Sequence, residues 1–327
     1  MIKVRDKSLD GFRGIACIIV MISHVGHAEI IGRWAVGIGK YGVAIFFVLS
    51  AYLMCYMADK ALPERSNYWL SYLKSRFFRI FPLYFVVCSL FLVGGYFSGL
   101  FEFGVADYLS NIFLIDGYRH LWAIPVEFKF YLVFPLLFMI AWGMDEKGRI
   151  KALGWLWLSS FLISFFGIWD NVSLLKYLNL FVAGMIAYTL SGHLSVMDVL
   201  TSNKKKIYLI VTLLFFVSNP AVFSVLFFPV KFDFLHDYLF VFGVAAALLI
   251  LLIRCDKRLK VMLENNLLVF IGSRSYSLYL LHPFVLYAVK QAKLGWFSLI
   301  VFILVVLAVS EVTYKKVEIP FMRFAKS

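Results

Sequence analysis

Long apolar runs dominate this sequence and constrain its fold more than any other feature. A hydrocarbon core about 30 Å thick requires about 20 residues of α-helix, with a usable range of about 17–25. Because lipid offers backbone groups no hydrogen-bond partners, runs of this length predict helices. Ten segments qualify or nearly qualify: residues 9–28, 37–57, 80–98, 121–143, 152–169, 174–191, 206–226, 236–254, 267–289 and 295–314. We therefore predict an all-α fold, a polytopic integral membrane bundle of about ten transmembrane helices.

The composition agrees with a lipid environment. Hydrophobic residues make up 62% of the chain and charged residues 16%, against about 45–50% and about 25% in soluble domains. The first apolar run follows basic residues as a signal peptide would. It nevertheless contains Arg13 and His24 and lacks a small-residue cleavage site, so we interpret it as an uncleaved first span.

The excess of basic residues raises the question of nucleic acid, since the formal charge is +13. Basic residues occur in short tracts between apolar runs, such as Lys204, Lys205 and Lys206. Most Lys and Arg residues fall on one side of the membrane when the N-terminus is placed inside, which is the usual cytoplasmic bias. We therefore predict cytoplasmic N- and C-termini and no nucleic-acid partner.

The domain organisation is predicted to be simple. The sequence has no linker rich in Gly, Ser or Pro and no convincing repeat, so we expect one membrane-embedded domain over residues 1–327 without an appended soluble catalytic domain. The four cysteines show no CxxC or Cys/His ligand spacing, so we expect no metal: Cys17, Cys55, Cys88 and Cys255. Chemistry must then be performed by the membrane helices.

Arg13 and His24 lie in the first run, LDGFRGIACIIVMISH. Eleven residues separate them, about three helical turns and about 16 Å, so they share nearly the same helix face. Ionisable groups at this depth are costly and usually mark a pathway or a site. A neutral imidazole can accept a proton near neutral pH, which makes His24 a candidate general base. The alternative is a buried histidine bonded to a backbone carbonyl.

A catalytic imidazole needs an orienting partner, and Glu127 in HLWAIPVEFKFYLVFP is the best candidate by its expected depth. Pro125 is acceptable in the first turn of that helix. Tyr131 lies four residues further on the same face and could donate a hydrogen bond to Glu127. The alternatives are a carboxylate near a helix N-terminus for Glu127 and an interfacial tyrosine for Tyr131.

A basic cluster precedes the third run in KSRFFRIFPLY, where Pro82 is expected to open the helix. Arg76 and Arg79 offer bidentate contacts to phosphate, and Arg13 could add a further charge at the mouth of the same cavity. These cations suit a phosphate-rich donor. For Lys74 we favour contact with lipid headgroups.

A polar stripe marks the ninth run, SRSYSLYLLHP. Ser275, Tyr279 and His282 fall on one helical face, which could line a channel or form inter-helix hydrogen bonds. The other histidines are expected in solvated or headgroup-contacting positions at the membrane interface: His27, His120, His193 and His236.

At these residues the chain resembles the acyltransferase-3 family of membrane acyltransferases. SLDGFRGIACIIVMISH and GVAIFFVLSAYL are similar to the first two family motifs, and RFFRIFPLY, HLWAIPVEFKFYLVFP and SYSLYLLHP to later ones, in family order. Three positions depart from the pattern: Ala44 replaces an Asp, Ala51 a Gly, and Phe128 a second carboxylate. Glu127 is then the one acidic partner expected on that side.

The resemblance implies a ten-span bundle that uses acyl-CoA, usually acetyl-CoA, to O-acylate surface glycans such as O-antigen, exopolysaccharide or lipid-linked saccharides. It implies His24 as the catalytic base and places Arg13, Arg76 and Arg79 toward CoA. We assign the remaining polar residues to the channel or substrate path: Asp10, Ser50, Tyr131, Ser275, Tyr279 and His282. The expected location is the bacterial inner membrane, in contact with lipid.

Two alternatives stay open at this point. An acyl group could rest on Ser50, Tyr279 or His24 before transfer. A proton-coupled transporter could instead use His24, Glu127 and His282 as a relay, although the sequence shows no paired interrupted helices in corresponding halves. The acceptor, the acyl chain length and the oligomeric state are not encoded in any pattern that we recognise.

Overall fold

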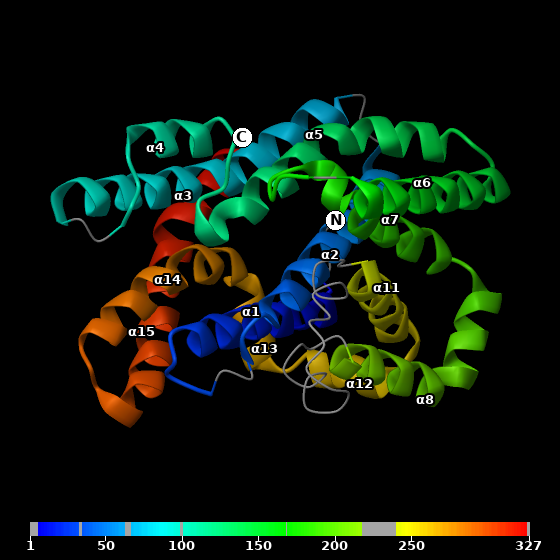
Figure 1. Ribbon diagram of the computed structural model, residues 1–327. Helices are drawn as coiled ribbons and strands as arrows, with labels where there is room; N and C mark the ends of the chain where they lie inside the picture. The colour runs from blue at the N-terminus through cyan, green and yellow to red at the C-terminus, as the bar shows by residue number, and fades with distance from the viewer. Residues whose placement is uncertain are drawn as a thin grey trace.

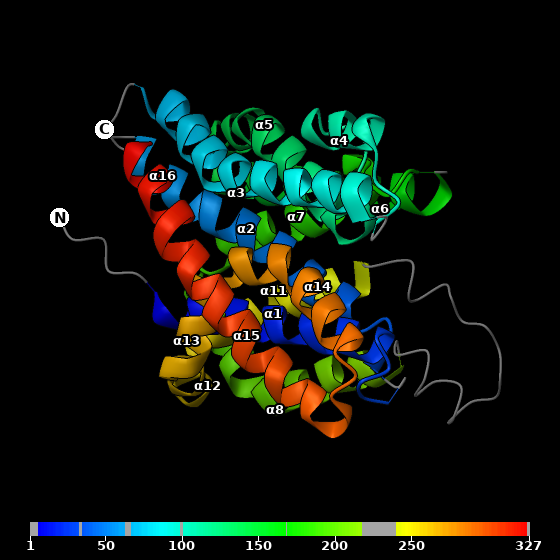
Figure 2. The ribbon, with the colours of Figure 1, turned by 90° about the vertical axis from the view of Figure 1, so that its left-hand side faces the viewer.

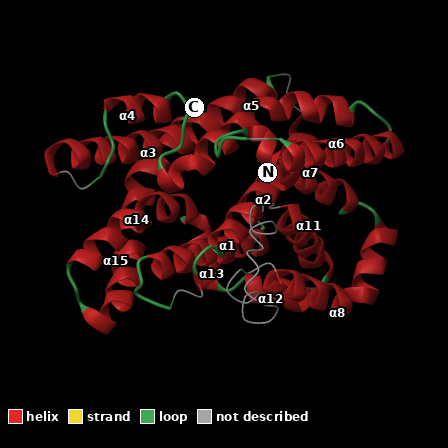
Figure 3. Ribbon diagram, viewed as in Figure 1, coloured by secondary structure: helices red, strands yellow, loops and turns green. Residues whose placement is uncertain are grey.

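The computed structural model describes residues 6–32, 35–62, 67–98, 101–167, 169–217 and 240–325. Within these ranges every regular element is a helix (Figure 3), which confirms the all-α prediction. His236 and parts of the predicted spans 206–226 and 236–254 lie outside the described residues.

In the N-terminal half the described elements are, in order, α1 (Lys7–His27), α2 (Gly39–Ala61), α3 (Tyr68–Ser98), α4 (Val105–Ile112), the 3-10 helix η3 (Arg119–Trp122), α5 (Ala123–Trp142) and α6 (Glu146–Phe166). The remaining described elements are α7 (Leu174–Leu190), α8 (Leu194–Val217), α11 (Phe240–Cys255), α12 (Lys257–Leu263), α13 (Asn266–Ser273), α14 (Ser275–Gln291), η4 (Gly295–Phe297), α15 (Ser298–Thr313), the π-helix η5 (Tyr314–Glu318) and α16 (Ile319–Phe324).

Fewer helices than expected are long and apolar enough to cross a membrane. Among the described residues there are five: Lys7–His27, Gly39–Ala61, Tyr68–Phe97, Arg119–Trp142 and Gly295–Phe324. A sixth is obtained if α7 and α8, which meet at 105°, form one broken span. The membrane-bundle prediction is supported, but the count of ten spans is not.

One source of the difference is Arg274. The predicted span 267–289 is divided there into α13 and α14, since Arg274 has non-helical backbone angles of φ −109° and ψ 9°. Its guanidinium forms an ion pair with Glu311 of α15 and stacks 3.9 Å from the Phe270 ring centroid. The side chain is therefore held by another helix at the point where the backbone turns.

Two helix starts also differ from prediction. α3 begins at Tyr68 and runs through Pro82, which lies inside the helix rather than at its start. α8 begins at Leu194, twelve residues before the predicted span 206–226, and so contains the basic tract Lys204, Lys205 and Lys206. In both cases local charge and proline signals were outweighed by continuation of an adjacent helix.

Figures 1 and 2 show two layers of helices. α3, α5, α6 and α7 form one layer, while α1, α13, α12 and α8 belong to the other. α2 packs against α1, α7, α11 and α5 and so connects the two layers. The long segment from α15 to α16 crosses from one layer to the other (Figure 2), where α16 contacts α3.

Close backbone approaches fix α1 in its layer. A Cβ atom at Gly272 of α13 would lie 1.8 Å from the carbonyl oxygen of Asp10, and one at Gly42 of α2 would lie 2.4 Å from the carbonyl oxygen of Ala16. Glycine lets backbones approach closely in helix pairs of membrane proteins. α1 is therefore held between α13 and α2 along its length.

Burial distinguishes central from peripheral helices. The apolar window of α2 is 72% buried, whereas that of Gly295–Phe324 is only 22% buried. Exposed side chains on the latter include Ile303, Leu304 and Val312. Large apolar side chains exposed along a whole helix suit contact with lipid rather than water.

Candidate functional site

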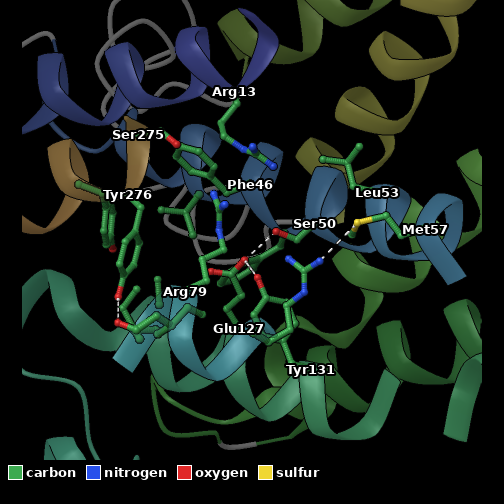
Figure 4. A pocket seen from close by; sticks show the side chains of 17 residues that line it. Arg13, Phe46, Ser50, Leu53, Met57, Arg79, Glu127, Tyr131, Ser275 and Tyr276 are labelled. Carbon is green, nitrogen blue, oxygen red and sulfur yellow. Dashed lines mark hydrogen bonds between the residues drawn. The ribbon is translucent and has the colours of Figure 1, made fainter. Parts of the chain in front are cut away.

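A polar cavity lies where the two layers meet, and Figure 4 shows its lining. Its volume is about 240 Å³. The lining side chains come from α1, α2, α3, α5 and α14: Arg13, Val43, Phe46, Phe47, Ser50, Leu53, Met57, Arg76, Arg79, Ile80, Ala123, Ile124, Glu127, Tyr131, Ser275, Tyr276 and Tyr279. We call it the arginine cavity.

Three guanidinium groups enter this cavity from two helices. In Figure 4, Arg13 of α1 and Arg79 of α3 point toward one another across the space. Arg13 has a carboxylate partner, Asp10, at 3.7 Å. The two α3 arginines donate to methionine sulfur atoms: Arg76 to Met57 at 3.5 Å and Arg79 to Met322 at 3.7 Å.

The Nε atom of Arg76 is buried and has no hydrogen-bond partner in the described part of the chain. Buried polar groups are normally satisfied, so an orphan donor in a cavity calls for an explanation. An anionic ligand with several acceptor oxygens would supply the missing partners, because guanidinium groups bind phosphate through paired N–H donors.

Glu127 of α5 is the carboxylate among these arginines. Its Oε1 atom accepts hydrogen bonds from Ser50 of α2 at 2.6 Å and from Tyr131 at 2.5 Å. The hydrogen bond from Tyr131 to Glu127 confirms the prediction made from their four-residue spacing. This cluster joins α2 to α5 at one wall of the arginine cavity.

Three histidines form a second group outside this cavity, which we call the histidine cluster: His24, His120 and His282. His24 Nδ1 and His282 Nε2 are 2.9 Å apart. The ring centroids of His24 and His120 are 6.4 Å apart, and those of His120 and His282 are 5.5 Å apart. Residues from α1, η3 and α14 therefore meet at this point.

His120 was expected in a solvated position at the interface, and that prediction is wrong. The residue is 6% exposed, and its Nε2 atom lies 3.3 Å from the Leu280 carbonyl oxygen. Tyr279 donates a short hydrogen bond to the His120 carbonyl. A signal was available, since His120 lies seven residues before Glu127 and hence two helical turns away on a similar face.

The expected pairing of Glu127 with His24 is also wrong. Among the described residues His24 bonds to His282, while Glu127 bonds to Ser50 and Tyr131. Glu127 lies seven residues beyond His120, a rise of roughly 10 Å along the helix. The sequence argument estimated the membrane depths of Glu127 and His24 only approximately. A separation of two helical turns is enough to place the Glu127 carboxylate in the arginine cavity instead of beside His24.

The remaining candidates divide between these groups. Ser275 and Tyr279 line the arginine cavity, whereas His282, on the same stripe, reaches the histidine cluster. Asp10 is buried and pairs with Arg13 without lining the cavity. Lys74 is exposed, with its Nζ atom 5.6 Å from the Phe324 ring centroid, in agreement with a role outside the site.

Glu318 was not considered from sequence. It is 2% exposed and accepts hydrogen bonds from the backbone and hydroxyl of Ser277. It belongs to the π-helix η5, and such bulges are frequent near functional sites. Its position in a charged segment after an apolar run gave no signal of burial.

The chemistry that this arrangement allows has two parts. The arginine cavity can hold an anion, and the histidine cluster contains rings that can accept a proton. Within the described ranges no group of three or more His, Cys, Asp or Glu side chains is positioned to hold a metal ion.

Comparison with known proteins agrees with the motifs. The acyltransferase-3 family model, described as an acyltransferase domain, matches residues 6–312. A Staphylococcus aureus protein named "Putative O-acetyltransferase" is 23% identical over 96% of this chain and 57% of its own length. The peptidoglycan O-acetyltransferase OatA of Listeria monocytogenes is 27% identical over 44% of this chain and 26% of its own length.

A Rhizobium radiobacter protein named for the picA locus is 33% identical over 41% of this chain and 63% of its own length. The chain thus spans little more than half the length of the staphylococcal relatives that it matches. No solved structure is significantly similar.

The family match extends over most of the sequence and includes all of the proposed site residues. It favours the acyltransferase interpretation over the transporter. The chain belongs to the acyltransferase-3 family.

Proposed function

We propose that this protein transfers an acyl group, with acetyl preferred, from cytoplasmic acyl-CoA to a hydroxyl group of an extracytoplasmic glycan, in the bacterial cytoplasmic membrane. The observation that carries the proposal is that an arginine cavity and a histidine cluster lie along the same helices: α1 and α14 contribute side chains to both. An anion site and a proton acceptor in one bundle are the two elements that such a transfer requires.

The spacing of the two groups supports an elongated donor. Arg13 and His24 are separated by about 16 Å of helix, and Ser275 and His282 by about 10 Å. CoA carries its phosphates at one end and its thioester at the end of a flexible arm. Phosphates held by Arg13, Arg76 and Arg79 would leave the arm to extend past Tyr279 toward His24.

The transfer step then follows from the histidine chemistry. His24 takes the proton of the acceptor hydroxyl as its oxygen attacks the thioester carbonyl carbon. The new C–O bond forms, the C–S bond breaks, and the imidazolium returns the proton to the departing CoA thiolate. This direct route needs no acyl group on the protein, and Ser50 lies with the arginines rather than with His24.

The acceptor is proposed from the relatives' names. Two of them are named O-acetyltransferases, and one of these acts on peptidoglycan according to its name. A glycan hydroxyl is therefore the favoured acceptor class, in O-antigen, exopolysaccharide, a lipid-linked saccharide or peptidoglycan.

Mass spectrometry of surface glycans tests the proposal. Glycans from cells expressing the wild type should show an added acyl mass. His24→Ala should lower the rate of acylation by about 10³-fold, within the range that a general base contributes. His193→Ala is the matched control, because His193 pairs with Glu146 away from both groups.

Membrane abundance of each variant should be equal in the comparison. Wild-type acylation that His24→Ala leaves intact would remove His24 as the base. Absence of any added mass, together with proton-coupled uptake into vesicles without CoA, would contradict the transferase proposal itself.

A further inference from the structure

For neutral rings, the direction of the hydrogen bond between His24 and His282 follows from the backbone contact of His282. His282 is fully buried on α14, and its Nδ1 atom lies 3.1 Å from the Leu278 carbonyl oxygen one helical turn earlier. A carbonyl oxygen can only accept a hydrogen bond, so His282 Nδ1 carries the proton. A neutral imidazole has one N–H group, and Nε2 of His282 is therefore an acceptor.

That acceptor fixes the tautomer of His24. His24 Nδ1 lies 2.9 Å from His282 Nε2, and a bond between them requires the proton to be on His24. In the neutral ring the proton is then on Nδ1, and the lone pair is on Nε2. The atom of His24 that faces away from His282 is thus the one able to accept a proton.

We propose that His282 is the positioning residue of the base, which holds His24 in the tautomer with a free Nε2 atom. The proposal rests on the function proposed above. His282 takes the place that Glu127 was expected to fill, but acts through a neutral ring. In catalytic triads the third residue has this same task of fixing tautomer and orientation.

The pair also suits the proton-transfer step. When His24 Nε2 accepts the acceptor's proton, His24 becomes an imidazolium whose Nδ1–H still donates to His282 Nε2. The hydrogen bond becomes charge-assisted and hence stronger, without movement of either ring. The ring contact of His120 is with the backbone instead: its Nε2 atom lies 3.3 Å from the Leu280 carbonyl oxygen.

Histidine nitrogen-15 NMR of the purified protein tests the pairing directly. Protonated and unprotonated ring nitrogens have well-separated shifts, and comparison with a His24→Gln spectrum assigns the His24 signals. The wild type should show a protonated Nδ1 and an unprotonated Nε2 for His24. His282→Leu, which removes the acceptor, should abolish this single-tautomer signature.

Kinetics with acetyl-CoA and glycan provide the second readout. His282→Leu should lower kcat by about 100-fold or more, as loss of an orienting partner does, with the donor KM within about threefold of wild type. His282→Gln, whose amide oxygen can accept the same hydrogen bond, should retain activity within about tenfold. His193→Leu is the control for loss of a histidine elsewhere.

Two outcomes would overturn the assignment: a wild-type spectrum with the His24 proton on Nε2, or equal losses in the Leu and Gln variants with an unchanged His24 spectrum. If the wild type transfers no acyl group, the proposed function fails. The nitrogen spectrum still decides the pairing in that case, so the two failures are distinguishable.

Discussion

The arginine cavity and the histidine cluster share two helices, α1 and α14, but differ in charge and in the bonds that hold their side chains. α1 supplies Arg13 to one and His24 to the other, and α14 supplies Ser275 and His282. The cavity holds three cations and one carboxylate. The cluster is held by the hydrogen bond between the His24 and His282 rings, at 2.9 Å, and by ring contacts with backbone carbonyls.

This difference indicates that donor binding and proton transfer can be assigned to separate groups of side chains within one helical bundle. Charges are costly in lipid and are retained where a ligand compensates them. A base must instead be neutral before it reacts, and neutral hydrogen bonds orient it at lower cost. We therefore expect substitutions in the cavity to change donor KM and those in the cluster to change kcat.

The largest cavity effect is expected for Arg79→Ala. Loss of a charge-assisted hydrogen bond to phosphate costs about 1.5–3 kcal/mol, which corresponds to about a 10- to 100-fold higher KM for acetyl-CoA. Steady-state kinetics at saturating acceptor measure it. Lys74→Ala, on the same helix but exposed, should leave KM unchanged.

A fall in kcat with an unchanged KM for Arg79→Ala would break the division proposed between the two groups. Equal effects of Arg79→Ala and Lys74→Ala would show that the arginine acts only through general membrane-surface charge.

A smaller effect on stability is expected for Gly272→Ala. The added Cβ would lie 1.8 Å from the Asp10 carbonyl oxygen, so α13 must move away from the Arg13 end of α1. Overpacking of this kind costs about 1–3 kcal/mol. The melting temperature in detergent should fall by several degrees, with a higher donor KM.

Gly154→Ala is the matched control, since nothing lies within 4 Å of a Cβ atom at Gly154 in α6. Its melting temperature should equal or slightly exceed that of the wild type, because Ala favours helix over Gly. A Gly272→Ala protein as stable as wild type would mean that the two backbones can separate freely.

The smallest effect is expected for Glu127→Gln. The amide oxygen can still accept from Ser50 and Tyr131, and loss of the negative charge leaves the arginines freer to bind phosphate. kcat should stay within about threefold of wild type, with donor KM unchanged or lower. A fall in kcat of about 100-fold under the same conditions would instead support the original prediction that Glu127 orients the base His24.

Sequence reasoning predicted much of this site but not its division. Arg13, Arg76 and Arg79 do meet in one cavity, as the basic cluster ahead of the third apolar run predicted. Long apolar helices over residues 9–28, 37–57 and 121–143 also agree with α1, α2 and α5.

The failures share a cause. Depth in the membrane was estimated from position in a run, and this put Glu127 beside His24 and His120 at the surface. A shift of two helical turns lies within the error of that estimate, yet it decides which side chains touch. At the break between α13 and α14, Arg274 likewise contacts Glu311, which lies 37 residues away in the sequence.

The sequence by itself determined that the chain is helical, that it is a membrane protein, and which ionisable side chains are too costly to be incidental. These follow from local hydrophobicity, helical period and the cost of burying charge. Only the tertiary structure decided that His24 pairs with His282, that Glu127 belongs with the arginines, and where long apolar runs bend. Those outcomes depend on how helices distant in sequence pack and on hydrogen bonds of specific length, which no local pattern encodes.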